Sequence, residues 1–138
     1  MTDRNDWNRD IIEQFRANAG TVGGQFEGIP LLILHTKGAK SGAERLNPLA
    51  YLEFEGRMFI FASMGGAPKN PDWFYNLLAN PEVSVEVGTS THHVRAVPLS
   101  GEERDRIYTE QGTRVASFVE YQQKTSRVIP VVELVPVS

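Results

Sequence analysis

Six short strand-like segments, joined by tight turns, constrain the fold of this chain more than any other feature. The segments are expected over residues 30–36, 45–54, 58–62, 83–87, 92–99 and 129–137. The turns Glu55-Gly56 and Gly88-Thr89-Ser90 each predict a β-hairpin, and the first three segments should be antiparallel neighbours. The first segment is a continuous apolar run, which is typical of a strand buried on both faces. This pattern predicts an α+β fold, a small and mainly antiparallel β-barrel with peripheral helices.

An amphipathic helix is expected before the barrel, from about Asp6 to Ala19. Its apolar side chains recur every four residues, and they are Trp7, Ile11, Phe15 and Ala19, with Ile12 beside them. The apolar face could pack on the barrel, on a second subunit or on a membrane surface, because amphipathicity alone fits all three. Residues 20–28 hold four glycines without any periodicity, so we expect a flexible connection or a mobile flap there.

Three further helices are expected at the margins of the barrel. Pro71 and Asn80-Pro81 bound a short helix over residues 72–79. The sequence Ser100-Gly101-Glu102-Glu103 matches a capping box, so a second helix should begin at Ser100 and run to about Gln111. A third is expected over residues 114–123, where the side chains that share one side are Val115, Phe118, Val119 and Gln122.

The length of 138 residues predicts one domain, with the helix and the glycine-rich segment over residues 1–28 and the barrel core over residues 29–138. The chain has no cysteine, which excludes disulfides, thiolate metal sites and cysteine nucleophiles. Its net charge of -3 argues against general nucleic-acid binding, because phosphate contacts need an excess of cations. No apolar run reaches the ~18 residues of a membrane span. We therefore expect a cytoplasmic protein, membrane-associated only through a peripheral contact of the N-terminal helix.

The stretch from Lys37 to Arg45 places three cations and two glycines in one turn of a net acidic chain. Local positive charge with approachable backbone N–H groups is what a bound phosphate or carboxylate requires, so this turn is a candidate anchor for an anionic cofactor. A plain solvated turn would fit the same residues. The end of this stretch resembles a P-loop, but that motif needs glycine where Leu34 and Ala39 stand, and it needs a parallel sheet. A nucleoside triphosphatase is therefore excluded.

The stretch from Ala62 to Pro68 contains a glycine bend on which a flat ring could rest. Trp73 follows in the first turn of the short helix, where free N–H groups also favour an anion. The neighbouring His92 and His93 point to opposite faces of a strand, so they cannot share a metal ion, and we expect no metal site. Ser63 has no histidine near it in sequence and no Gly-x-Ser-x-Gly elbow around it, so nothing indicates a serine hydrolase.

Four motifs occur in a fixed order along the chain. They are GAKSG with RLNPL over residues 38–49, ASMGGA over residues 62–67, NPDWFYNL with ANP over residues 70–81, and RVIPVV over residues 127–132. In this combination the chain resembles the deazaflavin-dependent nitroreductase family from about Pro30 to its C-terminus. The resemblance implies a split β-barrel of the FMN-binding-like type that binds coenzyme F420, an 8-hydroxy-5-deazaflavin whose tail carries a phosphate and glutamates.

The resemblance also implies which residues form the site. Lys40 and Arg45 would hold the tail phosphate, with further contacts from Ala39 and Ser41. The ring pocket would be lined from the second and third strands by Asn47, Pro48, Tyr51, Phe61, Ala62 and Ser63. The remaining cofactor contacts would come from Met64, which stands where the family often has lysine, and from the short helix through Asp72, Trp73 and Asn76.

The activity implied by the resemblance is transfer of a hydride from reduced F420 to an apolar, electron-poor acceptor such as a quinone, an enone or a nitro compound. Tyr121 and Ser63 are the candidates for the reaction centre, and Phe118 and Tyr121 should bind the acceptor. A deazaflavin passes its hydride from carbon, so the protein needs no nucleophile of its own. Two alternatives stay open, an FMN-dependent oxidoreductase of the same barrel fold and a protein that binds the deazaflavin without turnover. The chain is expected to be a monomer or a homodimer.

Overall fold

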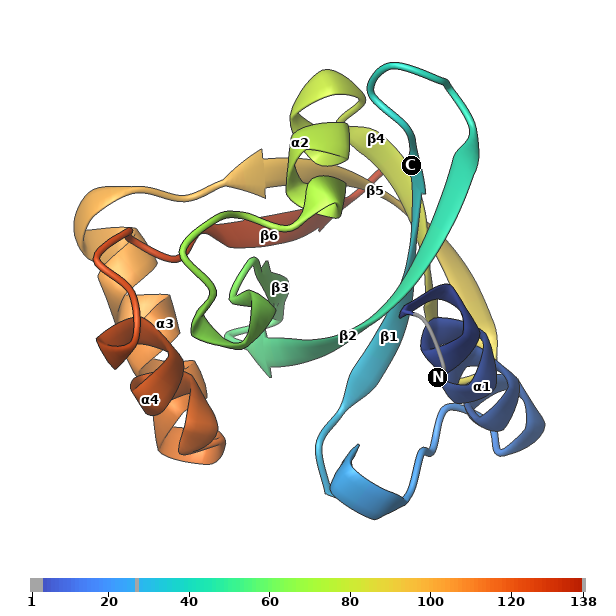
Figure 1. Ribbon diagram of the computed structural model, residues 1–138, viewed down its shortest axis with the longest axis horizontal. Coiled ribbons are helices and arrows are strands. Elements are labelled where there is room, and N and C mark those ends of the chain that lie inside the picture. Colours follow the sequence, from blue (N-terminus) through green and yellow to red (C-terminus); the bar gives the residue numbers. More distant parts are fainter. Residues whose placement is uncertain (1–3, 27, 138) are drawn as a thin grey trace.

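The computed structural model describes residues 4–26 and 28–137, without the side chains of residues 4–7 and Gln25, and within them six strands close into a barrel. The strand order is β1-β2-β3-β6-β5-β4, and all neighbouring pairs are antiparallel (Figure 1). The strands are β1 (Leu31–Lys37), β2 (Glu44–Phe54), β3 (Arg57–Phe61), β4 (Glu82–Val87), β5 (Ser90–Pro98) and β6 (Val131–Pro136). The predicted α+β barrel is confirmed.

Both predicted hairpins are present. In the turn between β2 and β3, Glu55 and Gly56 have φ angles of 57° and 72°. Two consecutive positive φ angles are those of a type I′ turn, whose twist matches that of the flanking strands. In the second hairpin Val87 pairs with Ser90, so the turn between β4 and β5 is equally short.

Strand β1 is buried on both faces, which explains its continuous apolar sequence. Leu32 and Leu34 are fully buried inside the barrel, in a cluster with residues of β3, β4 and β6. Leu31 and Ile33 alternate with them and pack on the outer side of the barrel wall, in the cluster that the N-terminal helix completes.

The N-terminal helix α1 (Arg4–Ala17) packs on the outside of the barrel through Ile11, Ile12 and Phe15. Among the described side chains, this apolar face therefore contacts the barrel, which was one of the three surfaces it could have covered. The side chain of Trp7, expected in the same stripe, lies outside the described residues. Figure 1 shows α1 beside β1 and β2, on the opposite side of the barrel from the C-terminal helices.

Helix α1 ends at Ala17, and the expectation that Ala19 continues its apolar stripe is wrong. Ala19 is exposed with a φ angle of 55°, and the N–H of Gly20 donates to the carbonyl of Phe15, which closes the helix. The glycine-rich segment that follows contains the short 3-10 helix η1 (Gly24–Phe26), and its Val22 is buried beside α1.

Helix α2 (Asp72–Ala79) has the predicted bounds, and α3 (Gly101–Arg114) begins at the predicted position but runs past Gln111. The predicted capping box is wrong, because Ser100 makes no side-chain capping hydrogen bond. The Glu103 carboxylate is turned elsewhere: it accepts hydrogen bonds from Arg57 Nη1 at 2.8 Å and from Arg106 Nη2 at 3.2 Å. Among the described helices, none combines the length and the apolar character that crossing a membrane requires.

Helix α4 (Ser117–Gln123) is shorter than predicted, because the chain leaves helical geometry at Val115. Phe118 is buried as expected, whereas Val119 is 46% exposed, so the expectation that both face one side is wrong. Val119 instead packs along α3 at Gly112, where a Cβ atom would lie 2.8 Å from Val119 Cγ2. The close approach of the two helices thus depends on the missing side chain at Gly112.

Candidate cofactor-binding site

Two adjoining cavities lie between β2, the bend after β3, and helices α1, α2 and α4. The first, here called the polar chamber, has a volume of about 580 Å³, and the second, the apolar chamber, has about 410 Å³. Both are lined by Asn8, Asn47, Met64, Pro71 and Trp73. Because they share these lining residues, the two chambers are neighbours, one polar and one apolar, and together they are here called the groove.

The polar chamber carries two cations and two carboxylates. Arg45 enters from β2 and Lys69 from the bend, while Glu44 and Asp72 border the same space. Its remaining lining residues are Leu46, Asn70 and Asn76. A guanidinium and an ammonium facing one cavity suit a ligand that carries phosphate or carboxylate groups.

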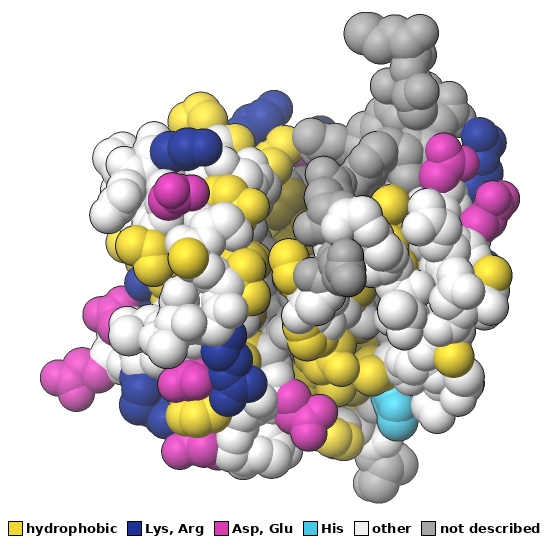
Figure 2. Space-filling view, turned by 90° about the horizontal axis from the view of Figure 1, so that it is seen from below, with side chains coloured by type: hydrophobic (Ala, Val, Ile, Leu, Met, Phe, Trp, Pro, Cys, Tyr) yellow, Lys and Arg dark blue, Asp and Glu magenta, His cyan; other side chains and the backbone are white. Residues whose placement is uncertain are grey.

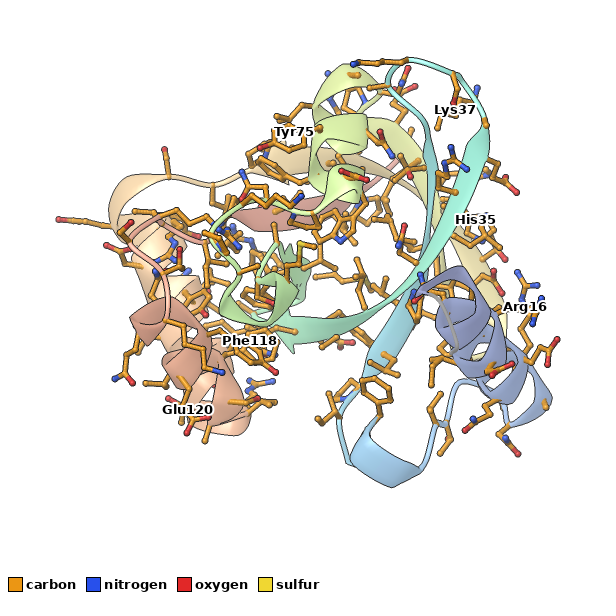
Figure 3. All side chains as sticks on the ribbon, viewed as in Figure 1. Arg16, His35, Lys37, Tyr75, Phe118 and Glu120 are labelled. Carbon is orange, nitrogen blue, oxygen red and sulfur yellow. The ribbon has the colours of Figure 1, made fainter. Side chains whose placement is uncertain are left out.

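The basic turn between β1 and β2 is tied to α2 by one buried side chain. The carbonyl oxygen Oδ1 of Asn76 accepts a hydrogen bond from the N–H of Ala39 at 2.9 Å, and its Nδ2 donates to Thr36 Oγ1 at 3.4 Å. Figure 1 shows α2 beside this turn, and Figure 3 marks Lys37 where the turn begins. Asn76 therefore joins the turn and α2 into one wall, and it occupies the N–H group that Ala39 was expected to offer a ligand.

The other predicted residues of this turn lie outside both chambers. Lys40 and Ser41 are exposed and line neither chamber. The hydroxyl of Ser41 accepts a hydrogen bond from the N–H of Ala43 at 3.2 Å, which shapes the turn itself. Of the two cations assigned to the tail phosphate, only Arg45 borders the polar chamber in this structure.

The apolar chamber is walled by aromatic rings. The Phe118 ring centroid lies 5.5 Å from that of Phe61 and 5.1 Å from that of Tyr121, both edge to face. Figure 3 shows Phe118 directed from α4 towards the barrel and Glu120 directed away from it. The lining is completed by Phe26, Ile29, Pro48, Leu49, Ala50, Ser63, Gly65 and Ser117. Figure 2 shows hydrophobic side chains gathered in a hollow between the two halves of one face.

Tyr108 packs behind this wall and belongs to none of the sequence motifs of the predicted site. Its hydroxyl donates to the carbonyl of Phe118, and its ring packs against Phe61 with a centroid separation of 5.9 Å. Burial raises the pKa of the Tyr108 hydroxyl to about 12. The hydroxyl therefore stays protonated at neutral pH and remains a hydrogen-bond donor.

The bend after β3 borders both chambers. It contains the 3-10 turn η2 (Met64–Gly66), and Met64, Gly65 and Gly66 all have positive φ angles, of 46°, 64° and 85°. A Cβ on Gly66 would lie 2.7 Å from the carbonyl oxygen of Tyr121, so only glycine lets the bend approach α4 so closely. A Cβ on Gly65 would meet nothing within 4 Å, so backbone is open to a ligand at that point. The bend thus exposes backbone at Gly65 towards the apolar chamber, and its role as a platform for a flat ring stays a prediction.

Two residues predicted to line the ring pocket lie elsewhere. Ala62 is fully buried in the barrel core, and Tyr51 packs against the same core. Burial raises the pKa of the Tyr51 hydroxyl. All the other residues that were predicted to contact the ring or the acceptor do border one or both chambers. They are Asn47, Pro48, Phe61, Ser63, Met64, Asp72, Trp73, Asn76, Phe118 and Tyr121.

Several lining residues were missed from the sequence. Lys69 could have been found, because it is a cation near the end of the bend of residues 62–70 and directly precedes the Asn70-Pro71 motif. Asn8, Phe26 and Ile29 gave no signal, since they belong to the segment before the barrel, and only the packing of α1 and η1 brings them to the groove.

The chain forms a small closed antiparallel barrel with a polar and an apolar chamber beside its glycine bend, and it belongs to the F420H(2)-dependent quinone reductase family, whose model matches residues 7–136. An F420H(2)-dependent quinone reductase of Mycobacterium tuberculosis is 38% identical over 124 residues, which cover 87% of this chain and 83% of that protein. The predicted resemblance to deazaflavin-dependent enzymes is therefore confirmed.

Solved structures agree in fold. An F420-H2 dependent reductase called FDR-A is 40% identical with a TM-score of 0.70, over 76% of this chain and 93% of that one. A structure described as a domain-swapped dimer is 37% identical with a TM-score of 0.71, over 96% of this chain and 99% of that one.

Proposed function

We propose that this protein binds F420 along the groove and catalyses hydride transfer from its reduced form to an apolar quinone. The observation that carries the proposal is that a chamber bordered by Arg45 and Lys69 adjoins a chamber walled by Phe61, Phe118 and Tyr121. F420 has the matching polarity, with a phosphate and glutamates on its tail and a flat ring at the other end. The residues present therefore fit the cofactor that the family name implies.

The protein's own part in the reaction is to bind, orient and exclude water. Arg45 and Lys69 bind the anionic tail through charge-assisted hydrogen bonds. The bend and Trp73 hold the ring, and Phe118 and Tyr121 hold the acceptor against it and keep water out. The bound cofactor supplies the hydride. We extend the proposal to Lys40, Ala39 and Ser41, which lie on the turn that Asn76 joins to the polar chamber and would meet the outer part of a long tail.

Titration with F420 and with FMN, followed by fluorescence, tests the cofactor. We expect F420 to bind more tightly, because FMN lacks the glutamate tail that the polar chamber accommodates. Stopped-flow mixing of the protein and reduced F420 with a soluble quinone then tests turnover. FMN binding as tight as F420 binding would favour the FMN-dependent alternative, and tight F420 binding without oxidation by quinones, enones or nitro compounds would favour a carrier.

We also propose that the chain forms a homodimer in which α1 is exchanged between subunits. Support comes from the relative described as a domain-swapped dimer and from the glycine-rich segment of residues 20–28, which joins α1 to the barrel. Asn8 of α1 borders both chambers, so an exchanged α1 would complete the partner's groove.

We also propose a cytoplasmic location with membrane contact at the N-terminal helix. The proposed acceptor supports this, because an apolar quinone partitions into membranes. Because Ile11, Ile12 and Phe15 are buried against the barrel, such contact would depend on other residues.

A further inference from the structure

Arg127 lies in the segment between α4 and β6 and donates four hydrogen bonds to the bend after β3. Its Nε donates to the carbonyl of Ala67 at 2.8 Å, and its Nη2 donates to the carbonyl of Ser63 at 3.0 Å. Its Nη1 donates to the carbonyl of Ala62 at 3.1 Å and to Asn70 Oδ1 at 2.8 Å. One guanidinium thus spans the bend from its first residue to its last.

These contacts are suited to arginine and to no other side chain. The guanidinium presents five N–H donors in a rigid planar fork, whereas lysine has a compact ammonium on a flexible stem. Burial lowers the pKa of Arg127, but an arginine side chain keeps its charge in proteins, so all its donors remain available. The bend has three consecutive positive φ angles, from Met64 to Gly66. Hydrogen bonds from Arg127 to carbonyl groups of the bend stabilise this strained backbone geometry.

Arg127 is itself hydrogen-bonded to α4, the helix that carries Phe118 and Tyr121 of the aromatic wall. Its carbonyl accepts a hydrogen bond from Gln122 Nε2 at 2.7 Å, and Gln122 Oε1 in turn accepts from Arg104 Nη2 at 2.6 Å and from the N–H of Ile129 at 3.1 Å. Gln122 follows Tyr121 directly on α4. The segment around Arg127 therefore fixes the position of the bend relative to the aromatic wall on α4.

We propose that Arg127 is a positioning residue for cofactor binding: its guanidinium holds the bend of residues 62–70 in the shape that the deazaflavin ring contacts. This inference rests on the proposed function. Arg127 lines neither chamber, so it acts through the bend and not by direct contact with the cofactor.

The test compares two ligands, F420 and a tailless 8-hydroxy-5-deazaflavin without phosphate and glutamates. Because the bend contacts the ring, Arg127→Ala should weaken the binding of both ligands by at least about tenfold. Arg45→Ala, which removes a tail contact, should weaken F420 only. Arg95→Ala is the matched control, since it removes an exposed guanidinium that pairs with Glu82 on the outside of the barrel.

Chemical rescue separates positioning from a role in stability alone. Guanidinium chloride at millimolar concentration, far below denaturing levels, should restore most of the lost affinity of Arg127→Ala and leave Arg45→Ala and the wild type unchanged. Arg127→Lys should be intermediate, because an ammonium cannot span the four acceptors. A merely structural role would lower the melting temperature of Arg127→Ala and leave both dissociation constants of the folded protein unchanged.

Different results would contradict the positioning role of Arg127 and the proposed function. A wild-type protein that does not bind F420 contradicts the proposed function. A wild type that binds F420 while Arg127→Ala binds both ligands equally well overturns the positioning role, and so does a loss of affinity that guanidinium does not restore. If Arg127→Ala does not fold, Arg127→Lys decides: wild-type affinity for both ligands would overturn the proposal, and weaker binding of both would support it.

Discussion

Tyr121 and Phe118 lie three residues apart on α4 and border the same chamber, yet they differ in what a substitution would remove. Phe118 is buried among Phe61, Tyr108 and Tyr121, so its ring belongs to the core as well as to the groove. Tyr121 is only half-buried and carries the one phenolic hydroxyl among the lining residues of the apolar chamber. The two residues therefore allow pocket shape and proton donation to be tested separately.

We predict that Tyr121→Phe changes hydride transfer little, because solvent can protonate the product once the hydride has moved. Stopped-flow oxidation of reduced F420 by a quinone measures this directly. Phe118→Leu should instead raise the KM for the quinone through lost apolar contact, and it avoids the ~3–5 kcal/mol cost of a Phe→Ala cavity. A drop on the order of 10²-fold in the transfer rate of Tyr121→Phe, with KM unchanged, would show that the hydroxyl donates a proton.

Arg45 and Lys40 were predicted to share the tail phosphate, and the structure gives them unequal positions. We predict that Arg45→Ala weakens F420 binding at least about tenfold, since a charge-assisted hydrogen bond contributes roughly 1.5–3 kcal/mol. Lys40→Ala should have a smaller effect, because Lys40 lies on the turn outside the chamber. Fluorescence titration of both variants measures the two constants. Both residues are exposed, so each substitution should change the free energy of unfolding by no more than ~0.5 kcal/mol. A larger loss of F420 affinity in Lys40→Ala than in Arg45→Ala would contradict the prediction and indicate that the phosphate binds at the turn.

At the scale of elements, α1 is the part whose attachment to the barrel has two separable components. Its apolar side chains pack beside Leu31 and Ile33, and its Arg16 forms a two-pronged ion pair with Glu86 on β4, at 3.0 Å from Nε and 2.7 Å from Nη2. His35 Nε2 lies 2.6 Å from the same carboxylate. The apolar component should dominate, because ion pairs near the surface contribute little.

We predict that Phe15→Ala destabilises the protein by ~3–5 kcal/mol, because Phe15 is completely buried and its removal leaves a cavity. Urea denaturation measures the loss. Gln14→Ala is the control, since the Gln14 side chain is exposed and its replacement should change stability by less than ~0.5 kcal/mol. Equal effects from the two variants would mean that α1 is not packed on the barrel in solution.

The ion pair makes a prediction about pH. Hydrogen bonds from Arg16 and then from His35 hold the pKa of Glu86 below its ordinary value of 4.5. A lowered carboxylate pKa stabilises the fold at pH values above the unfolded pKa, and that contribution disappears as the pH falls through the folded pKa. Glu86→Gln should therefore cost ~1 kcal/mol or less at pH 7, and the stabilities of variant and wild type should converge below pH 4.5. Urea titrations at a series of pH values would contradict this if the difference stayed constant.

The strands were predictable because alternation, turn residues and the apolar run of β1 are local signals. The partner of α1 was not, since an amphipathic pattern is the same whatever covers it. The capping box failed for a tertiary reason: Arg57, distant in sequence, pairs with Glu103. In the site, the motif residues from β2 to α2 mostly line the groove as expected, whereas the roles of Asn8 and Arg127 depend on packing between segments far apart in the chain.

For the whole molecule, the groove is assembled from parts that the chain order separates. Its platform follows β3, its aromatic wall comes from α4, and one shared lining residue, Asn8, comes from α1. Figure 1 shows α1 and α4 on opposite sides of the barrel. The glycine-rich segment of residues 20–28 is the covalent link between α1 and the barrel, so in the proposed dimer α1 could pack on the partner's barrel through the same apolar residues.

The last prediction tests that exchange with two variants that damage different parts of the groove. Asn8→Asp places a negative charge where the anionic tail binds, and Arg45→Ala removes a cation from the barrel side, so each homodimer should bind F420 weakly. If α1 is exchanged, a mixed dimer contains one groove with both changes and one with neither, and half of its sites should bind with wild-type affinity. Without exchange, every site carries one change and all stay weak. Co-expression with two different tags isolates the mixed dimer for titration, and light scattering of the wild type must first give twice the mass of one chain, since a monomer would end the proposal of dimerisation.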